Sequence, residues 1–206
     1  LAAADVERSF QVVDTVSIVQ TTLPNGTFDA VYNQQLSATG GNGSYTYALT
    51  AGALPNGITL SGAGLISGTP TVPGAYNFTV TATDSTPVGN GGPFAGSQAF
   101  ALSIDQAGQT ITFPDPGTQP YAVGGSFGLT ATASSGLTVS YAIAPASSTV
   151  CSVAGSTVSI LSAGACAITA SQGGDASYLA AADVSVTVAI SQATPTERNG
   201  TKFLTR

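Results

Sequence analysis

The sequence predicts an all-β protein built from two tandem sandwiches of short strands. Three observations support this prediction. Apolar and polar residues alternate over short stretches, which is typical of strands with one buried face. Turn residues such as Gly, Pro and Asn stand between these stretches. Thr, Ser and Gly are frequent in every segment, and all three disfavour a helix interior. Ser and Thr side chains compete for backbone hydrogen bonds, and Gly leaves the backbone with too much conformational freedom.

The expected strands follow one another at the spacing of a β-sandwich. The turn sequence Leu-Pro-Asn-Gly occurs twice, at residues 23–26 and 54–57, where Pro presets φ and Asn or Gly accepts the conformations that follow. The alternating stretches of the first half are residues 9–20, 44–50, 75–83 and 98–104. Those of the second half are residues 109–113, 126–133, 137–144, 149–153, 157–161, 165–170 and 183–190.

An internal repeat divides the chain into two domains. Residues 36–49 (LSATGGNGSYTYAL) align in sequence with residues 129–143 (LTATASSGLTVSYAI) with one insertion. Residues 80–83 likewise align with residues 168–171. The offset is about 90 residues, the size of one sandwich. We expect an N-terminal extension, a first sandwich, a second sandwich and a C-terminal tail, over residues 1–8, 9–106, 107–191 and 192–206.

Charge is scarce, and this excludes several classes of partner. Charged residues make up 7% of the chain, with four Lys and Arg against ten Asp and Glu, for a net charge of −6. Such a surface offers nothing basic to nucleic acid phosphates or to anionic lipids. No apolar run reaches the roughly 18 residues of a membrane-spanning helix, so we expect neither nucleic acid binding nor membrane insertion.

Catalysis is not expected. The chain has no histidine, so it cannot build a Ser-His-Asp triad, a Cys-His dyad or a histidine metal site. Its ten acids are scattered, and only Asp5 and Glu7 are close in sequence; we interpret them as solvated charges. A nucleophilic lysine could only be Lys202, in the expected tail. The sequence therefore predicts a non-enzymatic protein without a cofactor.

Cys151 and Cys166 are the only cysteines, and we expect them to form a disulfide. A zinc site would need more Cys or His ligands, and the spacing is too wide for a Cys-x-x-Cys redox motif. The pair falls on expected strands able to lie side by side or nearly so. The alternative is two buried free thiols. A disulfide would place the protein in an oxidising, extracytoplasmic compartment.

Residues 23–85, and above all the run LPNGITLSGAGLISGTPTVPGAYNFTVTATD, closely resemble the Ig-like repeats of bacterial surface proteins. Residues 109–182 look like another bacterial Ig-like repeat type, in which a Cys pair at these places is familiar. The resemblance implies two immunoglobulin-like sandwiches at an extracellular or cell-surface location. It also implies a distant likeness to cadherin-type domains, which bind calcium at their junctions. Asp84 and Asp105 are the weak calcium candidates, because the acid-rich junction motifs are missing.

Two classes of function, and a weaker third, fit the sequence. The first is a structural or adhesive module, a stalk or spacer of a bacterial surface protein. The second is a self-assembling fibre subunit in which a terminal strand, from residues 8–20 or 200–206, pairs with a sheet edge of another copy. The third is a carbohydrate-binding accessory domain of a secreted enzyme. Four aromatic side chains could form a sugar-binding face, but their parity indicates core packing instead: Tyr45, Tyr47, Tyr76 and Phe78. The expected partners are therefore proteins, copies of the chain itself, or cell-surface glycans.

Overall fold

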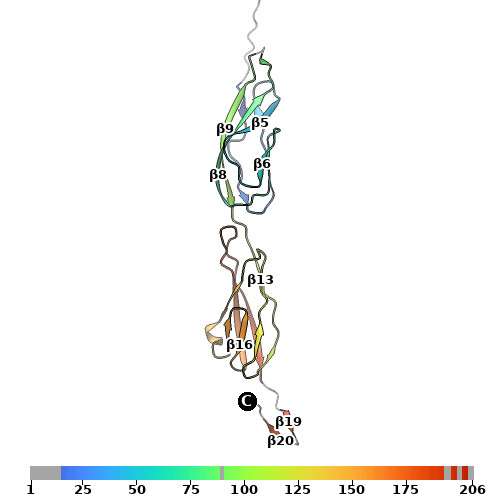
Figure 1. Cartoon of the computed structure of the whole chain (residues 1–206), viewed down its shortest axis with the longest axis vertical. Helices are drawn as coiled ribbons and strands as arrows, with labels where there is room; N and C mark the ends of the chain where they lie inside the picture. Colours follow the sequence, from blue (N-terminus) through green and yellow to red (C-terminus); the bar gives the residue numbers. More distant parts are fainter. Residues whose placement is uncertain (1–14, 89–90, 193–195, 199–200, 204–206) are drawn as a thin grey trace, which may run out of the picture. The chain divides into compact units, whose positions relative to one another are not determined.

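The computed structural model describes residues 15–88 and 91–192, together with the backbone of residues 196–198 and 201–203. The chain splits into two compact units, unit 1 (Leu1–Ala107) and unit 2 (Gly108–Arg206). Both consist of strands, as Figure 1 shows, so the predicted all-β class is confirmed. Within the described residues, no helix has the length and hydrophobicity to cross a membrane.

Unit 1 is a sandwich of a four-stranded and a three-stranded sheet, with one additional strand pair. The four-stranded sheet has the order β2-β9-β8-β5, in which β2 is parallel to β9 and the other pairs are antiparallel. The three-stranded sheet has the order β3-β7-β6, and β1 pairs with β4. The bounds are β1 Ser17–Ile18, β2 Gly26–Thr27, β3 Tyr32–Gln35, β4 Ala38–Thr39, β5 Tyr45–Gly52, β6 Ile58–Leu60, β7 Leu65–Gly68, β8 Gly74–Asp84 and β9 Ala95–Asp105.

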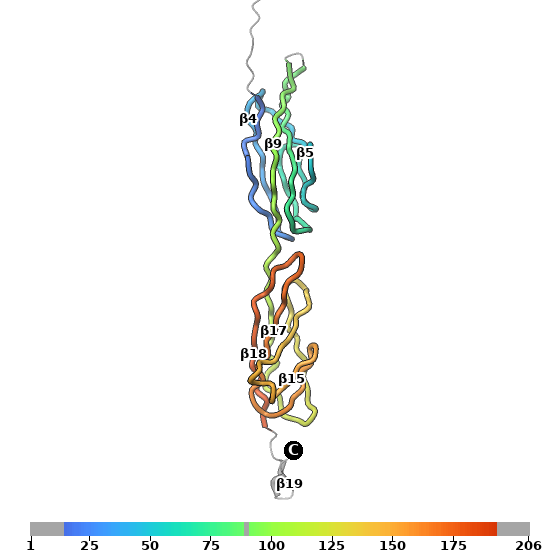
Figure 2. The backbone as a smooth tube through the Cα atoms, turned by 90° about the vertical axis from the view of Figure 1, so that its left-hand side faces the viewer, coloured from blue at the N-terminus to red at the C-terminus, as the bar shows by residue number. Residues whose placement is uncertain are grey.

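The core of unit 1 lies between these sheets and includes the start of the described chain. The inward positions of β8 and β9 alternate with outward Thr, Ser and Ala, as period-2 patterning requires. Val16 and Ile18 are buried in the same core. Residues 16–18 are therefore part of unit 1 itself, whereas residues 9–14 of the expected first strand lie outside the described residues. Figure 2 shows β9 running along the whole of this unit.

Unit 2 repeats the arrangement. Its four-stranded sheet has the order β11-β18-β17-β14, with β11 parallel to β18, and its three-stranded sheet has the order β12-β16-β15. β10 pairs with β13, as β1 pairs with β4 in unit 1. The bounds are β10 Ile111–Thr112, β11 Gln119–Pro120, β12 Ser126–Gly128, β13 Thr132–Ala133, β14 Ser140–Ile143, β15 Cys151–Ala154, β16 Thr157–Ile160, β17 Gly164–Ser171 and β18 Val184–Ser191, with a 3-10 turn at Pro145–Ser147.

The strand registers allow residue-by-residue comparison of the two units. Tyr47 faces Ala82 across β5 and β8, and Tyr141 faces Ala170 across β14 and β17. Ala82 and Ala170 differ by 88 positions, which is also the offset of the repeated segments 80–83 and 168–171. Each unit is thus one copy of the same sandwich, and each has its own core.

The C-terminal tail contains a strand pair of its own. The backbone of β19 (Thr196–Arg198) pairs antiparallel with that of β20 (Thr201–Phe203). Residues 200–206 were one candidate for strand exchange between copies. One edge of β20, within this segment, is therefore already paired with β19 of the same chain.

Candidate functional site

Cys151 and Cys166 form a disulfide across the core of unit 2. Their Cα atoms are 5.9 Å apart, and both residues have 0% exposure. Cys151 opens β15 in the three-stranded sheet, whereas Cys166 lies on β17 in the four-stranded sheet. The sequence suggested strands that lie side by side or nearly so, whereas the structure places β15 and β17 in different sheets. The bond joins the two layers of the sandwich, so it resists their separation directly.

Unit 1 fills the corresponding core position with aromatic rings. Cys166 pairs with Val188 in unit 2, and the residues 88 positions earlier are Phe78 and Phe100. These two rings are tilted with centroids 5.9 Å apart, and each is 3% exposed. Offset and tilted aromatic pairs of this kind stabilise a core beyond their buried area. One unit therefore uses a covalent bond where the other uses an aromatic pair.

Asp84, at the end of β8, holds two loops of unit 1 in place. Its carboxylate accepts hydrogen bonds from the backbone N–H of Asn42 (3.1 Å), Thr86 (3.2 Å) and Phe94 (2.8 Å), and from the Thr86 hydroxyl. Burial alone would raise the pKa of Asp84, but these donors outweigh it and hold the pKa below its ordinary value. The carboxylate therefore acts as an ionised cap that ties Asn42, Thr86 and Phe94 to the end of β8.

Asp105 lies at the other end of the same hairpin. Gly74 pairs with Ile104, while Thr83 pairs with Ala95, so Asp84 and Asp105 are separated by the length of an eleven-residue strand. That length is roughly 35 Å. Asp105 accepts a hydrogen bond from Asn25 Nδ2 at 3.1 Å. The structure thus does not bring the two calcium candidates together, and the described residues hold no cluster of three or more His, Cys, Asp or Glu.

Unit 2 replaces the Asp84 cap with neutral amides. The residue corresponding to Asp84 is Gln172, whose Oε1 accepts hydrogen bonds from the Gly174 backbone at 2.6 Å and from Gln109 Nε2. Gln109 also donates to the Leu179 carbonyl at 2.7 Å and accepts from the Ser135 hydroxyl. The same end of the sandwich is therefore held by a titratable group in unit 1 and by non-titratable groups in unit 2.

The four aromatic side chains considered for a sugar-binding face pack against the core of unit 1. Tyr47 and Phe78 are buried, and Tyr45 and Tyr76 are partly buried against them. The hydroxyls of Tyr45 and Tyr76 donate to the carbonyls of Gly40 and Val72. Leu49, which has the same parity along β5 as Tyr45 and Tyr47, is nevertheless 39% exposed, and the pairing of β5 with β8 shifts register immediately after it.

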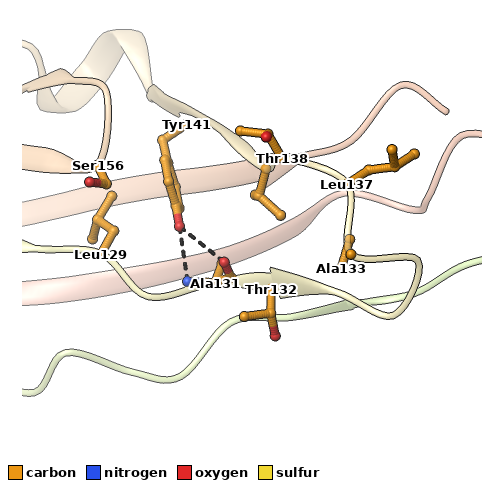
Figure 3. A pocket seen from close by; sticks show the side chains of 10 residues that line it. Leu129, Ala131, Thr132, Ala133, Leu137, Thr138, Tyr141 and Ser156 are labelled. Carbon is orange, nitrogen blue, oxygen red and sulfur yellow. Dashed lines mark hydrogen bonds between the residues drawn. The ribbon is translucent and has the colours of Figure 1, made fainter. Parts of the chain in front are cut away.

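A hollow of about 330 Å³ lies on unit 2 beside Tyr141. Figure 3 shows the Tyr141 side chain crossing to the segment around Ala131, where its oxygen accepts the Ala131 N–H at 2.9 Å. The wall is uncharged and mostly apolar, and we name it the edge groove after its position beside β14. The residues that define it are Leu129, Ala131, Leu137, Val139, Tyr141 and Ser156. Sequence reasoning missed this feature.

The edge groove exists because one hairpin of unit 2 is short. In unit 1, residues 61–64 join β6 to β7, and Gly64 lies against the Tyr47 ring, where an added Cβ would come within 2.8 Å. The Gly62 carbonyl accepts the Tyr47 N–H at 2.9 Å. In unit 2, only Gly155 and Ser156 join β15 to β16. Tyr47 is consequently 7% exposed, whereas Tyr141, its counterpart, stays partly open.

The topology and the cores define two immunoglobulin-like β-sandwiches, a fold typical of extracellular structural and adhesive modules. Residues 12–99 match the family model described as "Putative Ig domain", which confirms the resemblance of the first unit. A search of curated proteins gave no match.

Solved structures that are similar to this chain include cadherin tandem repeats. Mouse cadherin-23 EC22-24 is 21% identical over 87% of this chain, with a TM-score of 0.41. Protocadherin gammaB7 EC3-6 in a cis-dimer is 11% identical over 88%, with a TM-score of 0.44. A putative alpha-galactosidase from Bacteroides fragilis NCTC 9343 is 17% identical over 47%, with a TM-score of 0.36. This chain spans 67%, 51% and 19% of those chains, respectively.

Proposed function

We propose that this chain is a load-bearing spacer of an extracellular bacterial surface protein, without catalytic activity. A buried disulfide between the layers of unit 2 supports an oxidising location. The outer sheet faces support a spacer role, because they are polar without charge. Hydroxyl groups bridge neighbouring strands there, as between Thr50 and Thr81 (2.8 Å) and between Thr169 and Ser185 (2.8 Å).

The observation that carries the proposal is the parallel pairing of an early strand with the last strand in each unit. In unit 1, Gly26 and Thr27 of β2 pair with Ile104 and Asp105 of β9. In unit 2, β11 pairs with β18 in the same sense. The chain enters such a pair at one end and leaves it at the other. Tension between the two ends of a unit therefore loads these hydrogen bonds in shear, so that several must break together.

Single-molecule force spectroscopy on the chain, held by its two ends, tests this role. We expect two separate unfolding steps that reappear after relaxation. The Phe28 N–H donates to the Asp105 carbonyl at 2.9 Å within the unit 1 pair. Phe28→Pro removes this donor, and Phe28→Ala is the matched control that keeps it. The proposal predicts that only the proline variant lowers the unfolding force of unit 1 beyond the effect of losing the ring.

Two results would contradict a load-bearing role. One is a single unfolding step, or steps at forces no higher than those needed to stretch an unfolded chain. The other is an equal effect of Phe28→Pro and Phe28→Ala, because the parallel pair would then carry none of the load. As a check on step assignment, reduction should lengthen the unit 2 step by about 45 Å, since the disulfide spans 15 residues.

A further inference from the structure

β14 has one free edge. It is the last strand of the sheet β11-β18-β17-β14, and no other described strand pairs with it. The Ala144 N–H donates to the Ala167 carbonyl at 2.9 Å, so even-numbered residues of this strand direct their backbone groups toward β17. Hydrogen bonding alternates along an antiparallel pair. The backbone N–H and C=O groups of Val139, Tyr141 and Ile143 therefore face the open side, where the edge groove lies.

Unit 1 shows what kind of group covers this edge. The Ser85 N–H donates to the Ser44 carbonyl, so β5 has the same parity, and Tyr47 directs its N–H outward like Tyr141. That N–H is satisfied by the Gly62 carbonyl of the long hairpin. The covering group is thus a polypeptide backbone that supplies a carbonyl beside the tyrosine. Among the described residues, the shorter hairpin of unit 2 supplies no such carbonyl to the Tyr141 N–H.

The chemistry of the edge groove restricts its occupant. Its walls carry no charge, and the strand edge offers alternating donors and acceptors along its length. A suitable occupant is an extended, uncharged segment with an apolar side chain at every second position. Residues 9–13 (Ser-Phe-Gln-Val-Val) have this pattern, with Phe10 and Val12 on one face of an extended strand.

Chain length and position also favour this segment. The described core of unit 1 begins at Val16. Only Asp14 and Thr15 separate residues 9–13 from Val16, so this segment directly precedes the folded core in the sequence. A five-residue strand spans roughly 17 Å, which is enough to pair along the four residues of β14, Ser140–Ile143. We infer that the edge groove of unit 2 binds residues 9–13 of a second copy of this chain as an added strand.

Sedimentation velocity on the full chain over a range of concentrations tests this assembly. Val139→Pro removes one outward N–H without touching a bond to β17, as proline on an edge strand allows. A second variant replaces Gly155-Ser156 with Ser-Gly-Ala-Gly, the hairpin of unit 1, to cover the groove. A third changes Phe10 and Val12 to Asp. Val123→Lys is the matched control, because Val123 is 76% exposed and lies outside the groove.

The inference predicts concentration-dependent association of the unmodified chain and of Val123→Lys, and its loss in all three test variants. Circular dichroism confirms that each variant is folded. A peptide of residues 6–14 should dissociate the assembly by competing for the groove. A monomer at every concentration would overturn the inference, and so would association that persists in both the hairpin graft and the Phe10/Val12 variant.

Amide hydrogen exchange supplies a local readout. The Tyr141 amide should exchange at least about tenfold more slowly in the associated state than in dilute solution, because association gives it a carbonyl partner. The Tyr47 amide is the internal control, since Gly62 already protects it. Equal Tyr141 exchange in both states, despite association, would place the interface elsewhere and refute the assigned groove.

Discussion

Reducing the disulfide is expected to destabilise unit 2 and leave unit 1 unchanged. Cys151 and Cys166 are separated by 15 residues in sequence and join opposite layers of unit 2. A crosslink of this span lowers the chain entropy of the unfolded state by an amount worth about 3 kcal/mol. For a domain of 60–100 residues, 1 kcal/mol shifts the melting temperature by roughly 4–8 °C, so we expect a fall of roughly 12–24 °C.

Differential scanning calorimetry with and without a phosphine reductant measures this effect. Both sulfur atoms are buried, so the reductant should act only when unit 2 opens. Unit 1 has no cysteine and serves as the internal reference. Equal shifts of both transitions would refute the assignment of two separate cores. A shift of unit 2 below about 3 °C would refute the entropic reasoning, because it corresponds to less than 1 kcal/mol.

The remaining predictions concern unit 1. Phe78→Ala should cost about 3–5 kcal/mol, because the ring is 3% exposed and fills the position of the disulfide; Val31→Ala, at an 84% exposed site, should cost almost nothing, and urea unfolding compares them. The pKa of Asp84 is lower in the folded state, so the ionised carboxylate stabilises unit 1 fully above the unfolded-state pKa near 3.8. This stabilisation is lost as the pH falls through the folded-state pKa. The unit 1 transition should therefore drop below about pH 4 more steeply than in Asp84→Asn, and parallel acid profiles of the two proteins would contradict this. Gly57→Ala should destabilise unit 1 by about 1–3 kcal/mol, since φ is +87° and the new Cβ would lie 2.0 Å from the Thr69 carbonyl; an unchanged melting temperature would contradict the strain.

Many strands and turns were predictable because their causes are local, although residues 126–133, expected as one strand, form β12 and β13 in different sheets. The alternation over residues 75–83 and 98–104 predicts β8 and β9 closely, and Pro-Asn-Gly at 55–57 predicts the turn in which Gly57 adopts positive φ. Each of these signals depends only on neighbouring residues. The disulfide was also predictable, because the chain offers no other partner for either cysteine.

The arrangement of the strands was not predictable in the same way. Alternation indicates which face of a strand is buried, but not which sheet contains the strand. The strands of Cys151 and Cys166 were therefore expected to lie side by side or nearly so, and not in opposite layers. The partners of Asp84 come from positions 42, 86 and 94, which only the folded loops bring together. The edge groove depends on a two-residue difference between hairpins, and its effect on Tyr141 is visible only by comparison with Tyr47.

The spacer role is tested most directly by replacing this chain with an unrelated spacer in a protein displayed on a cell surface. A small binding tag would be displayed at the far end of this chain on bacteria, and the access of a large tag-binding protein measured. In a second fusion, two unrelated Ig-like sandwiches of the same total length replace the chain. The account predicts equal access in both, and loss of access when the spacer is deleted. Access that requires this particular sequence, or that survives deletion, would contradict a spacer function.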